Sequence, residues 1–183
     1  FEQYDLNLVM PLPLISREHR YVIEERVNAA GEVLIPINKK SVLDVITNIK
    51  RQKYQSVAVG FIHSYANNEH EIYLKNALFQ NLPDTMVSIS SEVSPQMREY
   101  ERFNTVSANA YVKPLMKSYL LRLKEKLRAE NIQCPIFLMH SGGGIISLES
   151  AAEFPVRLIE SGPAGGAVFA ATIARKYNLK NTL

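Results

Sequence analysis

The chain has 183 residues, of which 46% are hydrophobic and 21% are charged, and this composition is typical of a folded globular protein. These values exclude an intrinsically disordered chain and a coiled coil. The formal net charge is +3, and the Lys and Arg residues are interspersed with acids, so nothing indicates nucleic acid or a membrane surface as a partner.

The single cysteine and the four histidines form no pattern typical of a metal or nucleophile site. Cys134 stands before Pro135 and an apolar run, which favours a buried small hydrophobic residue over a nucleophile. With one cysteine and no apolar run of about 18 residues, neither an internal disulfide nor a membrane span is indicated, and we expect a cytoplasmic location. The chain begins at Phe1 rather than Met, and we interpret it as an internal piece of a longer protein.

Residues 1–37 contain short β-like runs and several prolines, which indicate an extended arm. Two of these runs flank residues 28–31 and predict a hairpin with Gly31 at a turn position of positive φ. Apolar residues at helical spacing then predict a helix, with Asn38 or Ser41 as its N-cap.

Residues 38–160 alternate between helical and strand patterns. Residues 56–63 form a compact apolar run typical of a strand buried on both faces. A helix is predicted from residue 69 up to Pro83, and residues 85–89 predict a second strand. This alternation predicts an α/β fold with a mixed, mostly parallel sheet and covering helices.

A long helical pattern covers residues 101–130. Pro114 lacks a backbone donor and clashes with the preceding turn, so we expect it to divide this stretch into two helical pieces. Residues 136–140 predict a further strand, residues 156–160 predict another, and a helix of small residues follows.

The first glycine cluster, Ser141, Gly142, Gly143 and Gly144, follows a predicted strand and leads toward a short helix. Ligands of open α/β sheets bind beyond the carboxyl ends of strands, and several backbone amides pointing one way can hold phosphate or another oxyanion. A tight turn that needs positive φ explains the same residues, and the residues alone favour this second interpretation.

The second cluster surrounds the start of the last predicted helix. Ser161 or Gly162 is expected at its N-cap and Pro163 at its first position. Gly165 and Gly166 then fall within the first two turns, where each costs about 1 kcal/mol relative to Ala. Such a cost indicates that another backbone, or a phosphate, approaches closely at these two positions.

Other motifs give little indication of catalysis. The sequence lacks the Walker, GxGxxG and GxSxG patterns, so an ordinary phosphate loop, a dinucleotide site and a serine hydrolase are unsupported. Glu99 and Glu101 alternate with Arg98 and Arg102, and salt-linked residues at the start of a helix are favoured over general acid or base residues.

Several blocks resemble, in order and at similar spacing, the hydantoinase A/5-oxoprolinase family, which includes N-methylhydantoinase, 5-oxoprolinase and components of acetone and acetophenone carboxylases. The blocks are ERVNAAGEVLIPIN, HSYANNEHE, SSEVSPQMREYER, NAYVKPLMKSYL, LMHSGGG and FPVRLIESGPAGGA, and they span nearly the whole chain. The resemblance implies an α/β fold of the ribonuclease-H-like, actin-like ATPase type.

The resemblance also implies a division of the chain. Residues 1–37 are the arm, residues 38–160 the α/β core of the first lobe, and residues 161–183 the inter-lobe connecting helix with the start of the next lobe. Gly165 and Gly166 are then expected to pack closely at the hinge between the lobes. Ser141, Gly142, Gly143 and Gly144, together with Ser161 and Gly162, are candidates for lining the nucleotide cleft.

The family's Asp-Gly-Gly phosphate loops are missing from this sequence. ATP and Mg²⁺ are therefore implied for the longer protein, and neither is expected to bind residues 1–183 alone. The implied function is ATP-dependent opening of five-membered cyclic amides, through phosphorylation of the amide oxygen, with a second subunit or a C-terminal half as partner. The alternatives are a subunit of an ATP-dependent ketone carboxylase and a non-enzymatic actin-like scaffold. The catalytic residues are not predicted.

Overall fold

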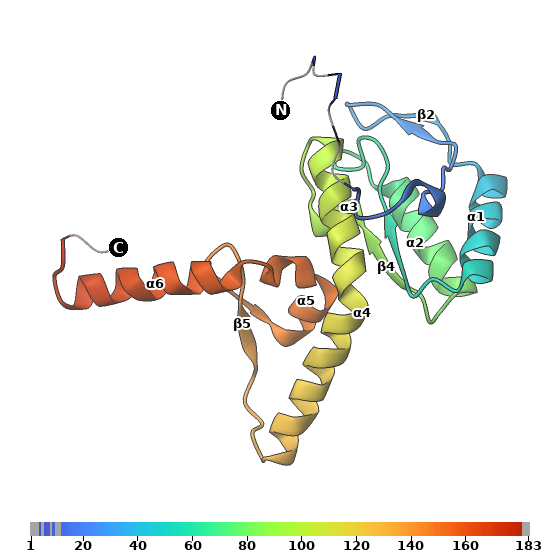
Figure 1. Ribbon diagram of the computed structural model, residues 1–183. Coiled ribbons are helices and arrows are strands. Elements are labelled where there is room, and N and C mark those ends of the chain that lie inside the picture. The colour runs from blue at the N-terminus through green and yellow to red at the C-terminus, as the bar shows by residue number, and fades with distance from the viewer. Residues whose placement is uncertain (1–3, 5, 8, 10–11, 181–183) are drawn as a thin grey trace.

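The computed structural model describes residue 4, residues 6–7, residue 9 and residues 12–180. One long helix, α4 (Glu99–Ala129), runs through the molecule (Figure 1). The elements before α4 form one body beside its N-terminal half, and the elements after it form a smaller body beside its C-terminal half (Figure 1).

The first body contains η1 (Arg17–His19), β1 (Arg26–Val27), β2 (Val33–Ile35), α1 (Lys39–Gln52), β3 (Ser56–Val59), α2 (Glu69–Asn81), β4 (Met86–Ile89) and α3 (Ser90–Val93). Strands β3 and β4 pair in parallel, and α2 is the crossover between them that a parallel pair requires. The predicted alternation of helices and strands is confirmed over this segment. Strand β3 covers only the first half of the predicted 56–63 strand, because the chain turns through residues 62–66.

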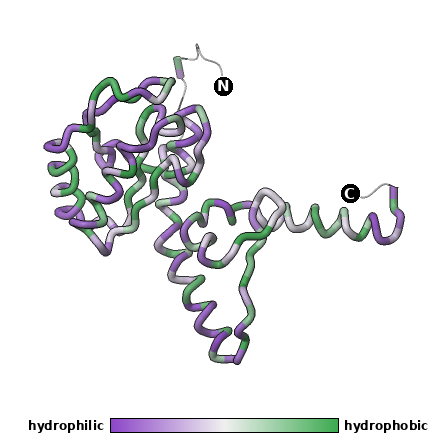
Figure 2. The backbone as a smooth tube through the Cα atoms, turned by 180° about the vertical axis from the view of Figure 1, so that it is seen from behind, coloured by the Kyte–Doolittle hydropathy of each residue, from purple (hydrophilic) through white to green (hydrophobic). Residues whose placement is uncertain are grey.

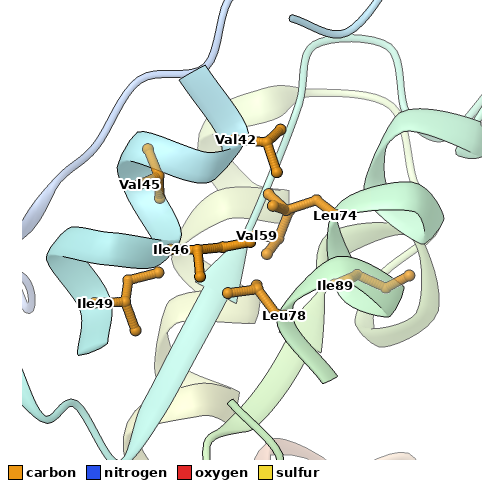
Figure 3. Packing of buried hydrophobic residues seen from close by; sticks show 8 residues of the cluster. All are labelled: Val42, Val45, Ile46, Ile49, Val59, Leu74, Leu78 and Ile89. Atoms are coloured by element: carbon orange, nitrogen blue, oxygen red, sulfur yellow. The ribbon is translucent and has the colours of Figure 1, made fainter. Parts of the chain in front are cut away.

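A hydrophobic core lies between the two helices and the parallel pair. Its buried members, shown in Figure 3, are Val42, Val45, Ile46 and Ile49 of α1, Leu74 and Leu78 of α2, Val59 of β3 and Ile89 of β4. The α1 residues fall at the i, i+3, i+4 and i+7 positions of one helix face. Burying each such side chain contributes about 1.5–3 kcal/mol, so this cluster fixes α1 and α2 on the strands.

The hairpin and the first helix cap form as the sequence predicts. Strands β1 and β2 pair antiparallel, and Gly31 in the turn between them has φ +85°. The Asn28 side chain accepts hydrogen bonds from two amides of the same turn, at 3.0 and 2.9 Å. Of the two candidate N-caps for α1, Asn38 is the one used, because its Oδ1 accepts the amides of Lys40 and Ser41.

Helix α4 continues through Pro114, so the prediction of two separate helical pieces is wrong. Proline removes one intrahelical hydrogen bond, a loss of about 3 kcal/mol. Packing on both sides of the proline offsets this loss. Ala110 and Lys113 are buried just before it, and Leu120 is buried on the same face against the second body.

The second body contains β5 (Phe137–Met139), β6 (Ile145–Ser147), α5 (Leu148–Glu153), η2 (Pro155–Leu158) and α6 (Ser161–Lys176). Its small core joins Leu120 of α4 to Leu148, Ala151 and Ala152 of α5. The strand predicted over residues 156–160 is wrong, because Pro155 starts the 3-10 helix η2 there. The Val156 amide donates to Asn109 Oδ1 of α4 at 3.2 Å instead of to a neighbouring strand.

Strand pairing in the described residues gives three two-stranded sheets. The pair β3–β4 is parallel as predicted, whereas β1–β2 and β5–β6 are antiparallel. The α/β class is confirmed, but these strands do not join into one larger mixed sheet. Strand β5 begins beyond the far end of α4 and connects to β6 by a short turn, a connection that only an antiparallel pair permits.

Helix α6 contacts the rest of the second body along its N-terminal half, and its C-terminal half extends away from both bodies (Figures 1 and 2). It begins at Ser161, after Glu160 in the left-handed region at φ +61°, so the prediction of Ser161 or Gly162 as N-cap is wrong. Pro163 is tolerated inside the first turn because the first amides of a helix have no intrahelical acceptor. Helix α6 has hydrophobic stretches (Figure 2) although none of its residues is buried. Across the described residues, each helix is too short or too polar to cross a membrane.

Candidate functional site

The hairpin that contains the first glycine cluster lies beside helix α6, which contains the second. Residues 141–144 form the turn of the β5–β6 hairpin, so they join two strands rather than a strand and a helix. A Cβ placed on Gly143 would lie 3.5 Å from Val168 Cγ2 of α6. A Cβ placed on Gly165 of α6 would lie 3.6 Å from Met139 Cγ of β5. The hairpin therefore contacts the first half of α6.

The hairpin turn needs its glycines for local reasons. Gly143 has φ +78°, a conformation that glycine adopts without steric cost. The His140 imidazole occupies the space beside the other two glycines, since a Cβ on Gly142 or on Gly144 would come within 2.7 Å of its ring atoms. The positive φ predicted for this tight turn is thus confirmed at Gly143, whereas the prediction that the turn leads from a strand into a helix is wrong.

Three amides of this turn already donate to acceptors within the protein. The Ser141 N–H donates to Arg157 O at 2.8 Å, the Gly142 N–H to His140 Nδ1 at 3.0 Å and the Gly143 N–H to His140 O at 2.9 Å. A phosphate cradle needs amides that point outward to an anion. These three amides do not fit that role, and a cleft-lining role for Ser141, Gly142, Gly143 and Gly144 stays a prediction.

The start of α6 is open in the described structure. Apart from the adjoining residues and the backbone of α6 itself, no described atom lies within 4 Å of a Cβ added at Gly162 or Gly166, and Gly165 meets only Met139 at an ordinary contact distance. The close backbone approach expected at Gly165 and Gly166 is therefore not made by the described part of the chain. Ser161 is half-buried beside Gly162, and the hinge and cleft roles of all four residues stay predictions.

A polar cluster lies near the carboxyl ends of β3 and β4. His63, in the turn after β3, donates its backbone N–H to Glu99 Oε1 at 3.2 Å, and its Nδ1 lies 3.8 Å from the same oxygen. The Tyr65 hydroxyl lies 3.4 Å from His63 Nδ1. The His63 N–H, with Arg102 nearby, holds the pKa of Glu99 below its ordinary value, so this carboxylate is ionised at neutral pH.

Beneath this cluster lies a fully buried carboxylate. Glu71 Oε1 accepts hydrogen bonds from the Phe61 N–H at 3.1 Å, the Ser64 hydroxyl at 2.8 Å and the Ser90 hydroxyl at 2.5 Å. Glu71 Oε2 accepts the Ser91 N–H at 2.9 Å. Buried charges persist when hydrogen bonds replace their hydration, and these four donors do so here.

The buried Arg102 links the carboxylate to the cluster above it. Its Nε donates to Ser90 Oγ at 3.0 Å, and one terminal nitrogen donates to Phe61 O at 2.7 Å and lies 3.4 Å from Glu99 Oε1. The other terminal nitrogen donates to Gln96 O at 3.1 Å. The interpretation of the acids at the start of α4 as salt-linked residues is confirmed, since Glu101 also lies 3.9 Å from Arg98.

Cys134 is exposed, so the prediction of a buried residue is wrong. It lies in the link between α4 and β5 and lines a shallow groove with Lys124 and Arg128. An apolar run following a proline indicated a core position, but only residues further along this run pack against the second core. In the described residues no group of three His, Cys, Asp or Glu side chains is placed to hold a metal ion.

The sequence interpretation missed the cluster of His63, Tyr65 and Glu99. The blocks HSYANNEHE and REYER contain these residues, but their meeting depends on how α4 packs across the ends of the strands. His63 has φ +59°, and although histidine adopts positive φ more often than most residues, a single histidine is too weak a signal to predict this conformation.

An α/β chain with a parallel pair, covering helices and glycine turns is consistent with a lobe of an actin-like ATPase. The model of the hydantoinase/oxoprolinase N-terminal region matches residues 2–82, and the hydantoinase/oxoprolinase model matches residues 102–183. The chain belongs to the hydantoinase/oxoprolinase family.

Sequence relatives agree with this assignment. An uncharacterised protein of Methanocaldococcus jannaschii is 37% identical over 96% of this chain and 26% of its own length. The alpha subunit of the caprolactamase of Pseudomonas jessenii is 29% identical over 99% of this chain and 26% of its own length. The 5-oxoprolinase of Saccharomyces cerevisiae is 32% identical over 81% of this chain and 12% of its own length. The chain thus spans about a quarter or less of these relatives.

Two solved structures share the fold. The ATP-dependent caprolactamase from Pseudomonas jessenii superposes with a TM-score of 0.86 at 29% identity, covering 97% of this chain and 26% of that chain. A nucleotide-free acetone carboxylase gives a TM-score of 0.77 at 23% identity, covering 87% of this chain and 23% of that chain.

Proposed function

We propose that this chain is part of an ATP-dependent enzyme that hydrolyses cyclic amides, with five-membered rings of the hydantoin or 5-oxoproline type as its substrates. The observation that carries ATP-dependent hydrolysis of a ring amide is the similarity, over 97% of the chain, to a caprolactamase that is itself ATP-dependent. Caprolactam is a cyclic amide, and so is the 5-oxoproline named for the yeast relative. Caprolactam has a seven-membered ring, so the two relatives share the ring amide and not the ring size, and the five-membered ring of this proposal is supported by the 5-oxoprolinase relative.

The reaction needs an activated amide, because an amide carbonyl is a poor electrophile. ATP supplies the phosphoryl group that, on the amide oxygen, makes the carbonyl carbon open to attack by water. Phosphoryl transfer depends chiefly on positioning and charge stabilisation, which suits a cleft between two lobes. We assign no phosphate contact to the 141–143 amides, and Mg²⁺ ligands are not expected among the described residues.

Helix α6 supports a position between two lobes in a longer protein. Helix α6 has no buried residue, and its small residues at Gly165 and Gly166 leave room for a close neighbour. We infer that a second lobe packs there and that the hinge lies at this helix. The names of the caprolactamase alpha and acetophenone carboxylase gamma relatives support a partner that is a further subunit.

A subunit of an ATP-dependent ketone carboxylase is the second candidate. The acetophenone carboxylase gamma subunit of Aromatoleum aromaticum is 25% identical over 94% of this chain, which favours it over a scaffold without activity. Carboxylation differs from hydrolysis in its need for bicarbonate.

Phosphate release by the full-length protein, together with its partner subunit, tests these alternatives. We expect ATP hydrolysis to be stimulated by hydantoin, 5-oxoproline or caprolactam and not to require bicarbonate. Stimulation by acetone or acetophenone that depends on bicarbonate overturns the proposal in favour of a carboxylase. If no compound in either group stimulates ATP hydrolysis, a non-enzymatic module is favoured.

A further inference from the structure

His63 and Glu99 lie at the carboxyl edge of the β3–β4 pair, where open α/β sheets bind their ligands. Their side chains are 25% and 34% exposed, so both are open to a ligand. The buried residues below them hold their backbone in place, since Arg102 donates to Phe61 O and lies beside Glu99. The His63 and Glu99 side chains are therefore accessible to a ligand, while the Arg102 contacts fix the residues around them.

The backbone is strained on both sides of this pair. His63 has φ +59°, and Arg98, directly before Glu99, has φ +82°. Both values lie in regions that residues with a Cβ rarely occupy. Such conformations persist only where the surroundings impose them, and they cluster at sites that bind ligands. At His63 this conformation accompanies the hydrogen bond from its backbone N–H to Glu99 Oε1.

Glu99 presents one free acceptor side. The contacts from the His63 N–H, from Arg102 and from His63 Nδ1 all fall on Oε1. The backbone N–H of Glu99 also donates to this carboxylate, and among the described residues no contact from another residue falls on Oε2, which can accept a hydrogen bond from a ligand N–H. A hydrogen bond to a charged acceptor is stronger than one to a neutral acceptor.

His63 presents a donor beside this acceptor. The Tyr65 hydroxyl lies 3.4 Å from His63 Nδ1, and a hydrogen bond donated by this hydroxyl would leave the ring proton of the neutral imidazole on Nε2. The imidazolium also carries a proton on Nε2, so this nitrogen donates in either state. Tyr65 in turn is fixed by the Arg102 guanidinium, whose carbon lies 5.5 Å from the centre of its ring.

We propose that Glu99 and His63 form the subsite that holds the amide edge of the cyclic substrate, an inference that rests on the proposed function. A small ring fixes its amide in the cis form, so that N–H and C=O point to the same side. Glu99 Oε2 accepts the ring N–H, and His63 Nε2 donates to the ring carbonyl oxygen. An acceptor beside a donor recognises a lactam, an imide or a hydantoin and rejects the corresponding lactone.

Steady-state kinetics of the full-length protein with its partner subunit test this subsite. The variants are Glu99→Gln, which removes the charge, and His63→Asn, which removes the imidazole but tolerates positive φ. The matched control is Glu101→Gln, an exposed acid of the same helix turn. We expect the KM for the cyclic amide to rise at least about tenfold in both variants and to stay unchanged in the control.

Two further readouts separate substrate binding from a structural role. The rise in the KM for the cyclic amide should exceed any rise in the KM for ATP by about tenfold. The Tm of His63→Asn should stay within a few degrees of the Tm of the unsubstituted protein. In the unsubstituted protein the inhibition constant of the lactam 2-pyrrolidinone should be at least about tenfold lower than that of the lactone γ-butyrolactone. In Glu99→Gln the ratio of these two inhibition constants should be smaller.

The outcomes distinguish the two proposals. If cyclic amides fail to stimulate the unsubstituted protein, the proposed function fails and the subsite fails with it. If they stimulate it but Glu99→Gln and Glu101→Gln give the same KM, only the subsite is overturned. Equal rises in the KM for ATP and for the amide, or an unchanged lactam preference in Glu99→Gln, overturn it as well.

Discussion

Glu71 and Arg102 are both fully buried, and the hydroxyl of Ser90 joins them. Ser90 Oγ accepts from Arg102 Nε at 3.0 Å and donates to Glu71 Oε1 at 2.5 Å. The pair ties α2 and α4 to the end of β4, with the Phe61 backbone shared between them. It fixes the turn that contains His63 and the start of α4, where Glu99 lies.

Glu71→Gln is expected to destabilise the protein by about 1–3 kcal/mol, because it removes the negative charge that the buried Arg102 reaches through Ser90 and leaves Glu99 as the remaining acidic partner of the guanidinium. The new amide group also meets the Ser91 and Phe61 N–H donors with one acceptor instead of two oxygens. Urea unfolding followed by circular dichroism measures the change. Glu69→Gln, exposed on the same helix, should change stability by less than about 1 kcal/mol. Equal effects of the two variants would contradict the role of the network.

Asn109 of α4 connects the two bodies. Its Nδ2 donates to Ser88 Oγ of β4 at 3.0 Å and to Glu153 O of α5 at 3.2 Å, while its Oδ1 accepts the Val156 N–H at 3.2 Å. Beside it, the buried Lys113 donates to Val87 O and to the Glu153 carboxylate. These bonds set the position of η2, whose Arg157 carbonyl accepts the Ser141 N–H of the glycine turn.

Asn109→Asp keeps the acceptor for the Val156 amide but loses the two N–H donors, so we expect the free energy of unfolding to fall by about 2–3 kcal/mol. Hydrogen exchange should show the largest increase in the amides of η2 and of the β5–β6 hairpin, with a smaller increase in α1. Asn104→Asp, on the exposed side of the same helix, is the control. A uniform increase across both bodies would mean that Asn109 stabilises the whole fold instead of fixing the second body.

Local patterns explain how much of the fold could be predicted. The α1 core face follows from apolar spacing within the helix, and the Asn38 cap and the Gly31 turn follow from residues in immediate contact. The prediction at Pro114 was wrong because it considered local sequence alone. Its local cost is real, but burial of Lys113 and Leu120 along α4 outweighs it, and such burial depends on elements far along the chain.

The candidate site could be predicted only in part. The glycine turn was found because Gly142 and Gly144 stand together in the sequence. Their partner, the His140 ring, could not be identified from sequence, because its orientation depends on the hairpin. In the buried network, 19 residues separate Glu71 from Ser90 and 12 separate Ser90 from Arg102. Polar residues this far apart carry no periodic signal, so only the fold shows that they meet.

Alanine substitutions at Gly144 and Gly166 test two different roles of glycine, in the hairpin turn and in the packing of α6. In residues 1–183, Gly144→Ala should destabilise the hairpin by about 1–3 kcal/mol, because the new Cβ would come within 2.7 Å of His140 Nε2. Gly166→Ala should instead stabilise α6 by about 1 kcal/mol, since no described atom lies within 4 Å of its Cβ position. Thermal unfolding measures both changes.

The double variant Gly144→Ala with His140→Ala should recover part of the loss, and an absence of recovery would show that the imidazole does not set the glycine requirement. The hinge proposal predicts a different result for the full-length protein. There Gly166→Ala should lower ATP hydrolysis although it favours the helix. Unchanged activity with raised stability would mean that no second lobe packs closely at this position.

The low pKa of Glu99 makes part of the stability depend on pH. The carboxylate accepts the His63 N–H and lies beside Arg102, so its pKa in the folded protein is lower than in the unfolded chain. A group of this kind stabilises the fold above its unfolded pKa, which is about 4.3 for glutamate, and the contribution is lost as the pH falls through the lower folded value. The Tm difference between the unsubstituted protein and Glu99→Gln should therefore be constant from about pH 6 to 7 and shrink below about pH 4. Melting curves collected across this range measure it. A difference that stays constant down to about pH 2.5 would show that the Glu99 charge does not contribute to the fold, and that its contacts act through shape alone.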